Sequence, residues 1–184
     1  AVENSKIFYI EGYMVTCAET FGAVESVLSN IKNKKPINSL SVSDAGIVQG
    51  FKDKFNEIES YGIDMIFCND DEGIAFAETE NFSDAVNIYK NKTYMTLITK
   101  GSEGSVVINN GKEICSPAVS IDPIDTNGAG DMYAGSFMHA YLNGLDLSKC
   151  AEFANYASSK SVQTFGPRLT PDGYKDILNK LKKS

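Results

Sequence analysis

Short apolar runs alternate with amphipathic segments along the first half of this 184-residue chain, and this alternation narrows the folds open to it. Residues 63–68 and 94–99 are continuously apolar, as strands of a buried parallel sheet are. Strands are also expected at 7–10 and 40–42, and helices at 21–31, from Asp44 as cap through Ile58, at 69–76 and at 82–90. Repeated strand–helix–strand units predict an α/β fold, a three-layer αβα sandwich with a mostly parallel sheet.

The pattern changes in the second half of the chain. Asn110-Gly111 separates two strand-like segments, 106–109 and 113–115, and this dipeptide is typical of a type I′ turn. The sequence therefore predicts a small antiparallel hairpin there. A last strand is expected at 118–122, followed by helices at 128–142, 147–165 and 171–181, the last of them capped by Thr170.

Composition excludes several classes of protein. Seventeen Lys and Arg against 24 Asp and Glu give a net charge of −7, which argues against nucleic acid as the main partner. No apolar run approaches the ~18 residues of a membrane span. The four cysteines are far apart and the first residues show no secretory signal, which favours reduced thiols in a cytoplasmic protein. With one histidine, a structural zinc site is not indicated.

The most informative segment is residues 125–131, Asp-Thr-Asn-Gly-Ala-Gly-Asp, directly before a predicted helix. Gly128, Ala129 and Gly130 leave the backbone N–H groups uncovered, and such donors at a helix N-terminus form an anion site. A carboxylate among them, Asp131, needs a separate task, and that task is to accept a proton from a hydroxyl that attacks a bound phosphate. The alternative is an ordinary helix cap before a glycine-rich turn.

Other phosphate and catalytic motifs do not fit this chain. Gly130 and Gly135 have the Walker spacing, but Ser136 follows instead of Lys. Tyr133 occupies the position of the third glycine of a dinucleotide-binding fingerprint, so an NAD-linked enzyme is a weak alternative. The only histidine, His139, lies mid-helix and no G-x-S-x-G elbow is present, which disfavours a Ser-His-Asp hydrolase.

Residues 125–131 resemble D-T-x-G-A-G-D, the C-terminal signature of the PfkB (ribokinase-like) carbohydrate and nucleoside kinases. Residues 68–72 resemble the N-x-x-E motif of this family, residues 99–104 its T-x-G nucleotide loop, and residues 154–157 the helix that borders its adenine pocket. These segments occur in family order along the chain. The closest similarity is to adenosine-kinase-like and bacterial sugar-kinase members, and the resemblance implies a ribokinase-like fold.

The resemblance also implies an ATP-dependent phosphotransferase that moves the γ-phosphoryl group to a primary hydroxyl of a sugar or nucleoside. Asp131 would be the catalytic base, and the amides of Gly128, Ala129 and Gly130 would form the anion hole. Asn69 would organise Mg²⁺ and its waters together with the carboxylate of Glu72.

The same resemblance places the remaining ligands. The nucleotide phosphates or ribose would be lined by Thr99, Gly101 and Gly104, and the base by Asn155; Asp125 and Thr126 could hold a monovalent cation such as K⁺.

Each of these roles has a structural alternative. Asn69 and Glu72 can form a capping box for the helix that follows. Gly101 and Gly104 can be turn residues, and Asn155 can be an amide on a helix surface.

One feature departs from the family pattern. Family members carry an N-terminal portion with a G-G-rich signature, much of the acceptor pocket and a β-sheet lid, and residues 1–60 do not resemble it. We therefore expect residues 1–184 to be the C-terminal part of a single PfkB-type kinase domain. Its partners would be a small sugar or nucleoside acceptor, the missing N-terminal portion or a second copy of the chain. The rival hypothesis is a non-catalytic nucleotide-binding or partner-binding fragment.

Overall fold

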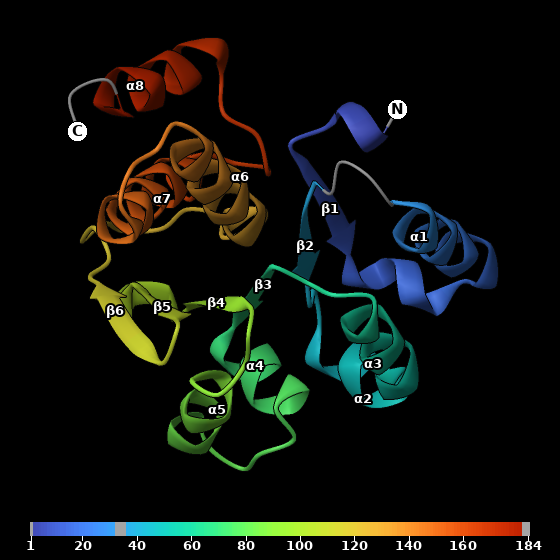
Figure 1. Ribbon diagram of the computed structural model, residues 1–184. Coiled ribbons are helices and arrows are strands. Elements are labelled where there is room, and N and C mark those ends of the chain that lie inside the picture. Colours follow the sequence, from blue (N-terminus) through green and yellow to red (C-terminus); the bar gives the residue numbers. More distant parts are fainter. Residues whose placement is uncertain (1, 32–35, 182–184) are drawn as a thin grey trace. The chain divides into compact units, whose positions relative to one another are not determined.

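The computed structural model describes residues 2–31 and 36–181 (Figure 1). Its six strands are hydrogen-bonded in chain order. They are β1 (Ile7–Glu11), β2 (Ile37–Ser41), β3 (Met65–Asn69), β4 (Met95–Thr99), β5 (Ser105–Asn109) and β6 (Lys112–Ser116). Asn110 and Gly111, between β5 and β6, both have positive φ, at 49° and 75°, which confirms the predicted type I′ hairpin.

The chain divides into two compact units. Unit 1 comprises residues 1–98 and 108–112, and unit 2 comprises residues 99–107 and 113–184. The helices of unit 1 are α1 (Ala18–Asn30), α2 (Ala45–Gly50), α3 (Lys52–Ser60), α4 (Asp70–Phe76) and α5 (Phe82–Tyr89). Those of unit 2 are α6 (Ala129–Leu142), α7 (Leu147–Ser161) and α8 (Pro171–Leu181).

Unit 1 contains the predicted parallel strands. β1 pairs with β2 in parallel, Ile7 opposite Ile37, and β2 pairs in parallel with β3, Ser39 opposite Met65. Ile66 and other apolar residues of this unit are fully buried, so its strands have the continuous apolar core expected of a parallel sheet.

The segment after Asp44 differs from the prediction of one helix. The Asp44 carboxylate accepts the N–H of Ile47 at 2.9 Å, which confirms the cap. The helix is interrupted at Phe51, whose φ of −131° and ψ of 28° are not helical, so that α2 and α3 are separate. The apolar stripe reaches the core in α3, where Phe55 and Ile58 are fully buried, whereas in α2 the buried residue is Val48 and Ile47 is only half-buried.

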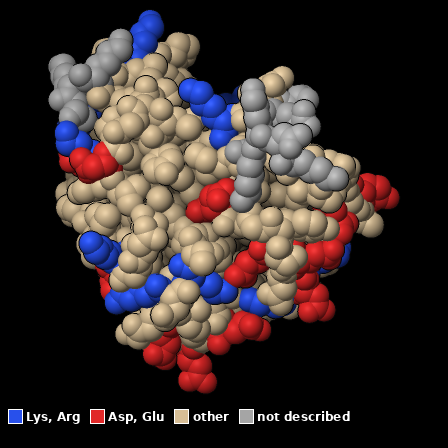
Figure 2. All heavy atoms as spheres, in the orientation of Figure 1, with Lys and Arg blue, Asp and Glu red and all other residues tan. Residues whose placement is uncertain are grey.

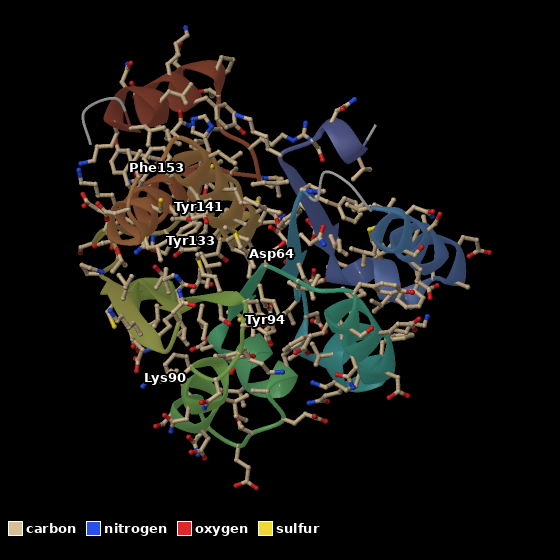
Figure 3. The ribbon with its side chains drawn as sticks, in the orientation of Figure 1. Asp64, Lys90, Tyr94, Tyr133, Tyr141 and Phe153 are labelled. Carbon is tan, nitrogen blue, oxygen red and sulfur yellow. The ribbon has the colours of Figure 1, made fainter. Side chains whose placement is uncertain are left out.

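Unit 2 is built around α6 and α7. Tyr133 and Phe137 of α6 are buried, and their rings stack with centroids 6.3 Å apart. The facing positions of α7 are small, with Ala151 and Ala154 fully buried, and small side chains let two helices approach closely. Figure 3 labels Tyr133 on α6 and Phe153 on α7.

Two predictions for unit 2 are wrong. Residues 118–122 form neither strand nor helix; β6 ends at Ser116, Pro117 after it has no N–H to donate to a ladder, and Val119 is 41% exposed. The helix expected to reach residue 165 ends at Ser161, and Phe165 beyond it is 83% exposed.

The surface carries charges of both signs, and the cysteines are unpaired thiols as predicted. On the face shown in Figure 2, Asp and Glu side chains lie among the Lys and Arg side chains. All four cysteines are free; Cys17 and Cys115 are exposed, whereas Cys68 and Cys150 are buried. Among the described residues, no helix combines the length and the hydropathy needed to cross a bilayer.

Candidate active site

The loop before α6 is shaped by Gly128. This residue is the N-cap of α6 with φ of 76°, a left-handed conformation that favours glycine. A Cβ atom at this position would lie 2.6 Å from the Cβ of Pro167. Glycine is therefore required by the backbone conformation and by the contact, and no side chain caps α6 by a hydrogen bond at this position.

Backbone N–H groups are left open in the first turn of α6. The N–H of Ala129 donates to the carbonyl of Thr126 at 3.2 Å. Within the part of the chain that the structure describes, the N–H groups of Gly128, Gly130 and Asp131 donate to no protein acceptor. The predicted anion hole at residues 128–130 thus has two open amides of its three, and Asp131 adds a third. Open donors and the positive end of the helix dipole suit an anion.

The carboxylate of Asp131 is accessible. It lies in the first turn of α6, is exposed, and lines a cavity of about 350 Å³. The cavity is walled by the exposed face of α6, including Gly135 and His139, and by Ile177 of α8. His139 is exposed. An exposed carboxylate beside open amides can accept a proton from a group that reaches this cavity.

Asp125 braces the loop in front of α6. Its two carboxylate oxygens accept the N–H groups of Asn127 and Gly166, each at 2.9 Å. These two donors hold the pKa of Asp125 below its usual range. The N–H of Ile124 also donates to the carbonyl of Val162 at 2.7 Å. Both oxygens of the carboxylate are therefore committed to backbone contacts, each with a second lone pair remaining.

The two glycines of loop 99–104 differ. At Gly104, with φ of 100°, a Cβ atom would lie 2.1 Å from the carbonyl oxygen of Ser116. Glycine is therefore needed here because another backbone segment packs directly against it. Gly101, with φ of 53°, has open space where its Cβ would lie. The N–H of Lys100 closes the loop by donating to the carbonyl of Gly104 at 2.8 Å. Of the two, only Gly101 offers the uncovered backbone that a ligand can approach.

Asn155 is buried at 8% exposure, so the alternative of a helix-surface amide is wrong. Its Nδ2 has four acceptor atoms within range, namely the Oγ of Ser105 at 3.1 Å, the carbonyl and the Oγ of Ser116, both at 3.0 Å, and the carbonyl of Pro117 at 3.3 Å. The two hydrogens of the amide are shared among these four acceptors, so no donor of this group is left over. The donor side of this amide is used inside unit 2, and a contact with a nucleotide base stays a prediction.

In unit 1, Asn69 and Glu72 form the capping box that the sequence offered as an alternative. The Asn69 Oδ1 accepts the N–H of Glu72 at 2.8 Å, and the Glu72 carboxylate accepts the N–H of Asn69 at 2.9 Å. The Asn69 Nδ2 donates to the other carboxylate oxygen at 2.8 Å. Burial raises the pKa of Glu72, and the Asn69 N–H partly offsets this. Among the described residues, no three His, Cys, Asp or Glu side chains gather as a metal cluster.

Sequence reasoning missed the side chains that hold the first turn of α6 in place. Ser158 of α7 donates to the carbonyl of Ala129 at 2.8 Å, and Tyr133 donates to the Oγ of Ser105 at 2.9 Å. These partners are 29 and 28 residues apart in the chain. No local pattern marks such pairs.

The protein has an α/β fold, and the first turn of its helix α6 presents open backbone N–H groups. The sequence matches the model of the pfkB family of carbohydrate kinases over residues 1–172, and the chain belongs to this family. The expected ribokinase-like α/β fold is confirmed, although the chain spans only about half the length of its curated relatives.

Adenosine kinases are among these relatives. The chain is 26% identical to the adenosine kinase of Dictyostelium discoideum over 179 residues and 31% identical to that of Saccharomyces cerevisiae over 180 residues. Each alignment covers 90% of this chain and 52% of the relative.

Solved structures of similar fold also include an adenosine kinase and a sugar kinase, and this chain again covers about half of each. An adenosine kinase from Sinorhizobium meliloti, 27% identical, superposes with a TM-score of 0.90 over 97% of this chain and 55% of its own. A probable sugar kinase from Rhizobium etli, 25% identical, has a TM-score of 0.88 over 98% of this chain and 56% of its own.

Proposed function

We propose that this chain carries the phosphate-binding and proton-accepting part of an ATP-dependent kinase that phosphorylates a primary hydroxyl of a nucleoside or sugar. The observation that carries the proposal is the set of three open amides, those of Gly128, Gly130 and Asp131, at the start of α6 beside an exposed carboxylate. Family membership and the adenosine kinase relatives support the reaction and the class of acceptor.

In this proposal, Asp131 accepts the proton of the acceptor hydroxyl as that oxygen attacks the phosphorus. The open N–H groups of α6 stabilise the negative charge that develops on the transferred group, and they are already oriented by the helix. Gly101 contributes uncovered backbone to the nucleotide phosphates, with Thr99 and Gly104 shaping the loop. ATP, when bound, supplies the phosphoryl group. Most of the rate enhancement then comes from positioning and electrostatics.

Asn69 and Glu72 are the proposed holders of Mg²⁺, through its waters. The fit rests on the donor set, because an amide oxygen and a carboxylate suit a hard cation that keeps several waters. The capping box leaves a second lone pair on each oxygen of Glu72. Mg²⁺, when bound, would neutralise phosphate charge.

Asp125 and Thr126 are proposed for K⁺, which would use the lone pair that remains on each Asp125 oxygen beside its accepted N–H group. Comparing turnover in potassium chloride and in tetramethylammonium chloride tests this part. Equal rates in the two salts would remove it.

The decisive experiment compares Asp131→Asn with Asp176→Asn, an exposed carboxylate on α8. Phosphate transfer from ATP to adenosine and to ribose is measured for the chain alone and with a polypeptide that supplies the N-terminal half of an adenosine kinase. Asp131→Asn should lower turnover by about 10²–10⁴-fold. Affinity for a non-hydrolysable ATP analogue should stay within about twofold, and Asp176→Asn should match the unsubstituted protein.

Two outcomes would contradict the proposal. Normal turnover in Asp131→Asn would remove this residue as the base. Binding of the ATP analogue without transfer to any acceptor, alone or with the added half, would favour the non-catalytic nucleotide-binding fragment.

A further inference from the structure

A buried cluster of polar side chains links loop 99–104 to α6 and α7 inside unit 2. Its centre is Ser105, 3% exposed, whose Oγ accepts the hydroxyl of Tyr133 at 2.9 Å and the Nδ2 of Asn155 at 3.1 Å. Tyr133 is 2% exposed and Asn155 8%. Buried polar groups that satisfy one another in this way are costly to break and hold their elements in one arrangement.

Each arm of the cluster ends at a proposed functional segment. Ser105 directly follows Gly104, the residue that closes loop 99–104 through its carbonyl contact with Lys100. Tyr133 follows Asp131 by two positions on α6, and Figure 3 shows where its ring lies. The hydroxyl of Ser105 therefore lies between the loop and the turn that carries the proposed base.

The third arm secures α7 to both segments. Asn155 donates toward Ser105 and toward the backbone of Ser116, the residue on which Gly104 rests. One turn later, Ser158 donates to the carbonyl of Ala129 in the first turn of α6. Loop, catalytic turn and α7 thus share one set of hydrogen bonds.

The hydroxyl of Ser105 is not placed to bind a ligand. Ser105 is only 3% exposed, and its Oγ accepts from Tyr133 and Asn155 inside the protein, so a ligand in the solvent-accessible part of the site does not reach it. Any influence on the reaction must pass through the segments that it joins.

We propose, building on the proposed function, that Ser105 is a positioning residue that keeps loop 99–104 in register with the first turn of α6 through Tyr133 and Asn155. The nucleotide loop and the base are thereby held in one relative geometry. Small displacements of reacting groups lower rates strongly while leaving ground-state binding nearly unchanged. Loss of the cluster should therefore act on kcat rather than on KM.

The first test is a double-mutant cycle on kcat. Ser105→Ala and Tyr133→Phe should each lower kcat by about tenfold or more, with KM for ATP unchanged within about twofold. The double variant should be no slower than either single one, because both remove the same link. Ser105→Thr, which keeps the hydroxyl, should recover most of the rate.

Two matched variants control for the loss of a hydroxyl. Tyr141→Phe alters another tyrosine of α6 (Figure 3), whose ring stacks on Phe137 at 6.4 Å. Ser159→Ala removes a buried hydroxyl that bonds only to its own helix, at the carbonyl of Tyr156. Both should keep the original kcat.

The second test needs no phosphate transfer, so it separates this proposal from the proposed function. Amide hydrogen exchange is followed at Lys100, in the loop, and at Met132, in α6, whose N–H groups are both hydrogen-bonded. Tyr133→Phe should speed exchange at Lys100, and Ser105→Ala should speed it at Met132, relative to the two control variants. The proposal would be overturned if Tyr133→Phe changed exchange only at Met132 and Ser105→Ala only at Lys100. Additive effects of the two substitutions on kcat would also overturn it.

Discussion

Two helices of this chain begin in opposite ways. α4 starts with a capping box in which Asn69 and Glu72 satisfy each other's backbone N–H groups. α6 starts at Gly128, with no side-chain cap, and keeps open donors in its first turn. A capping side chain stabilises a helix by about 1 kcal/mol. A helix that forgoes this gain keeps its donors available for a ligand.

The charges at these two starts differ as well. The first turn of α4 carries Asp70, Asp71 and Glu72, whereas that of α6 carries only Asp131. Three acidic residues complement the helix dipole from within the protein, and they would repel a bound anion. This difference in charge underlies the two proposed roles, a cation at the start of α4 and an anion at the start of α6.

The largest expected effect comes from covering the start of α6. Gly128→Ala should lower the free energy of unfolding by about 1–3 kcal/mol, because φ of 76° and the contact with Pro167 both oppose a Cβ. Affinity for inorganic phosphate should fall with it. Urea unfolding and calorimetry check the two effects. Full affinity in a folded variant would show that the anion binds elsewhere.

Removing the cap of α4 gives the next effect. Asn69→Ala should lower the free energy of unfolding by about 1 kcal/mol. Asn81→Ala is the matched control, because the Asn81 side chain caps α5 by accepting the N–H of Asp84 at 3.0 Å. Only Asn69→Ala should raise the Mg²⁺ concentration that half-maximal turnover requires. The same Mg²⁺ dependence in both variants would show that Asn69 caps α4 and does not bind Mg²⁺.

Gly130→Ala should separate stability from binding. No atom lies within 4 Å of the new Cβ, and alanine favours a helix by up to about 1 kcal/mol, so the protein should become slightly more stable. Phosphate affinity should nevertheless fall, since the methyl group lies next to an open amide. Gly22→Ala in α1, which has equally open space, should raise stability without touching affinity. Unchanged phosphate binding in Gly130→Ala would argue against the anion hole.

The smallest effect concerns Asp125, whose carboxylate holds the loop in front of α6 through two backbone N–H groups. The pKa of Asp125 is lowered in the folded state by the N–H groups of Asn127 and Gly166. A lowered pKa means that Asp125 stabilises the fold above the ordinary range near 3.9, and that this stabilisation is lost as the pH falls through the lowered value. Urea midpoints measured from pH 7 down to pH 3 should therefore fall less for Asp125→Asn. An equal fall would show that the brace contributes nothing measurable.

Much of the fold was predictable because its signals are local. Continuous apolar runs marked the buried strands, and Asn110-Gly111 marked the hairpin through residues that tolerate positive φ. The strand expected at 118–122 is absent because an apolar pattern does not reveal that the chain leaves the sheet after Ser116 and exposes Val119. The break at Phe51 likewise left the helical stripe intact and so gave no signal.

In the candidate site, too, features with a local sequence signal were predictable and features set by distant residues were not. The open amides of residues 125–131 were predictable, because the glycine and alanine residues that leave the backbone uncovered can be read directly from the sequence. The burial of Asn155 was not visible, because its partners Ser105 and Ser116 are 50 and 39 residues away. The roles proposed for Asp131, Gly101 and the other site residues stay predictions until the variants are measured.

The uneven exposure of the four cysteines has a practical consequence. Burial raises the pKa of Cys150 to about 11 and that of Cys68 well above its usual value, so their reactive thiolates are scarce at neutral pH. A maleimide dye should couple readily to Cys17 and Cys115 in the native protein and to all four sites only after denaturation. Counting attached dye by mass spectrometry then gives a reagent-based measure of how much of each variant is folded.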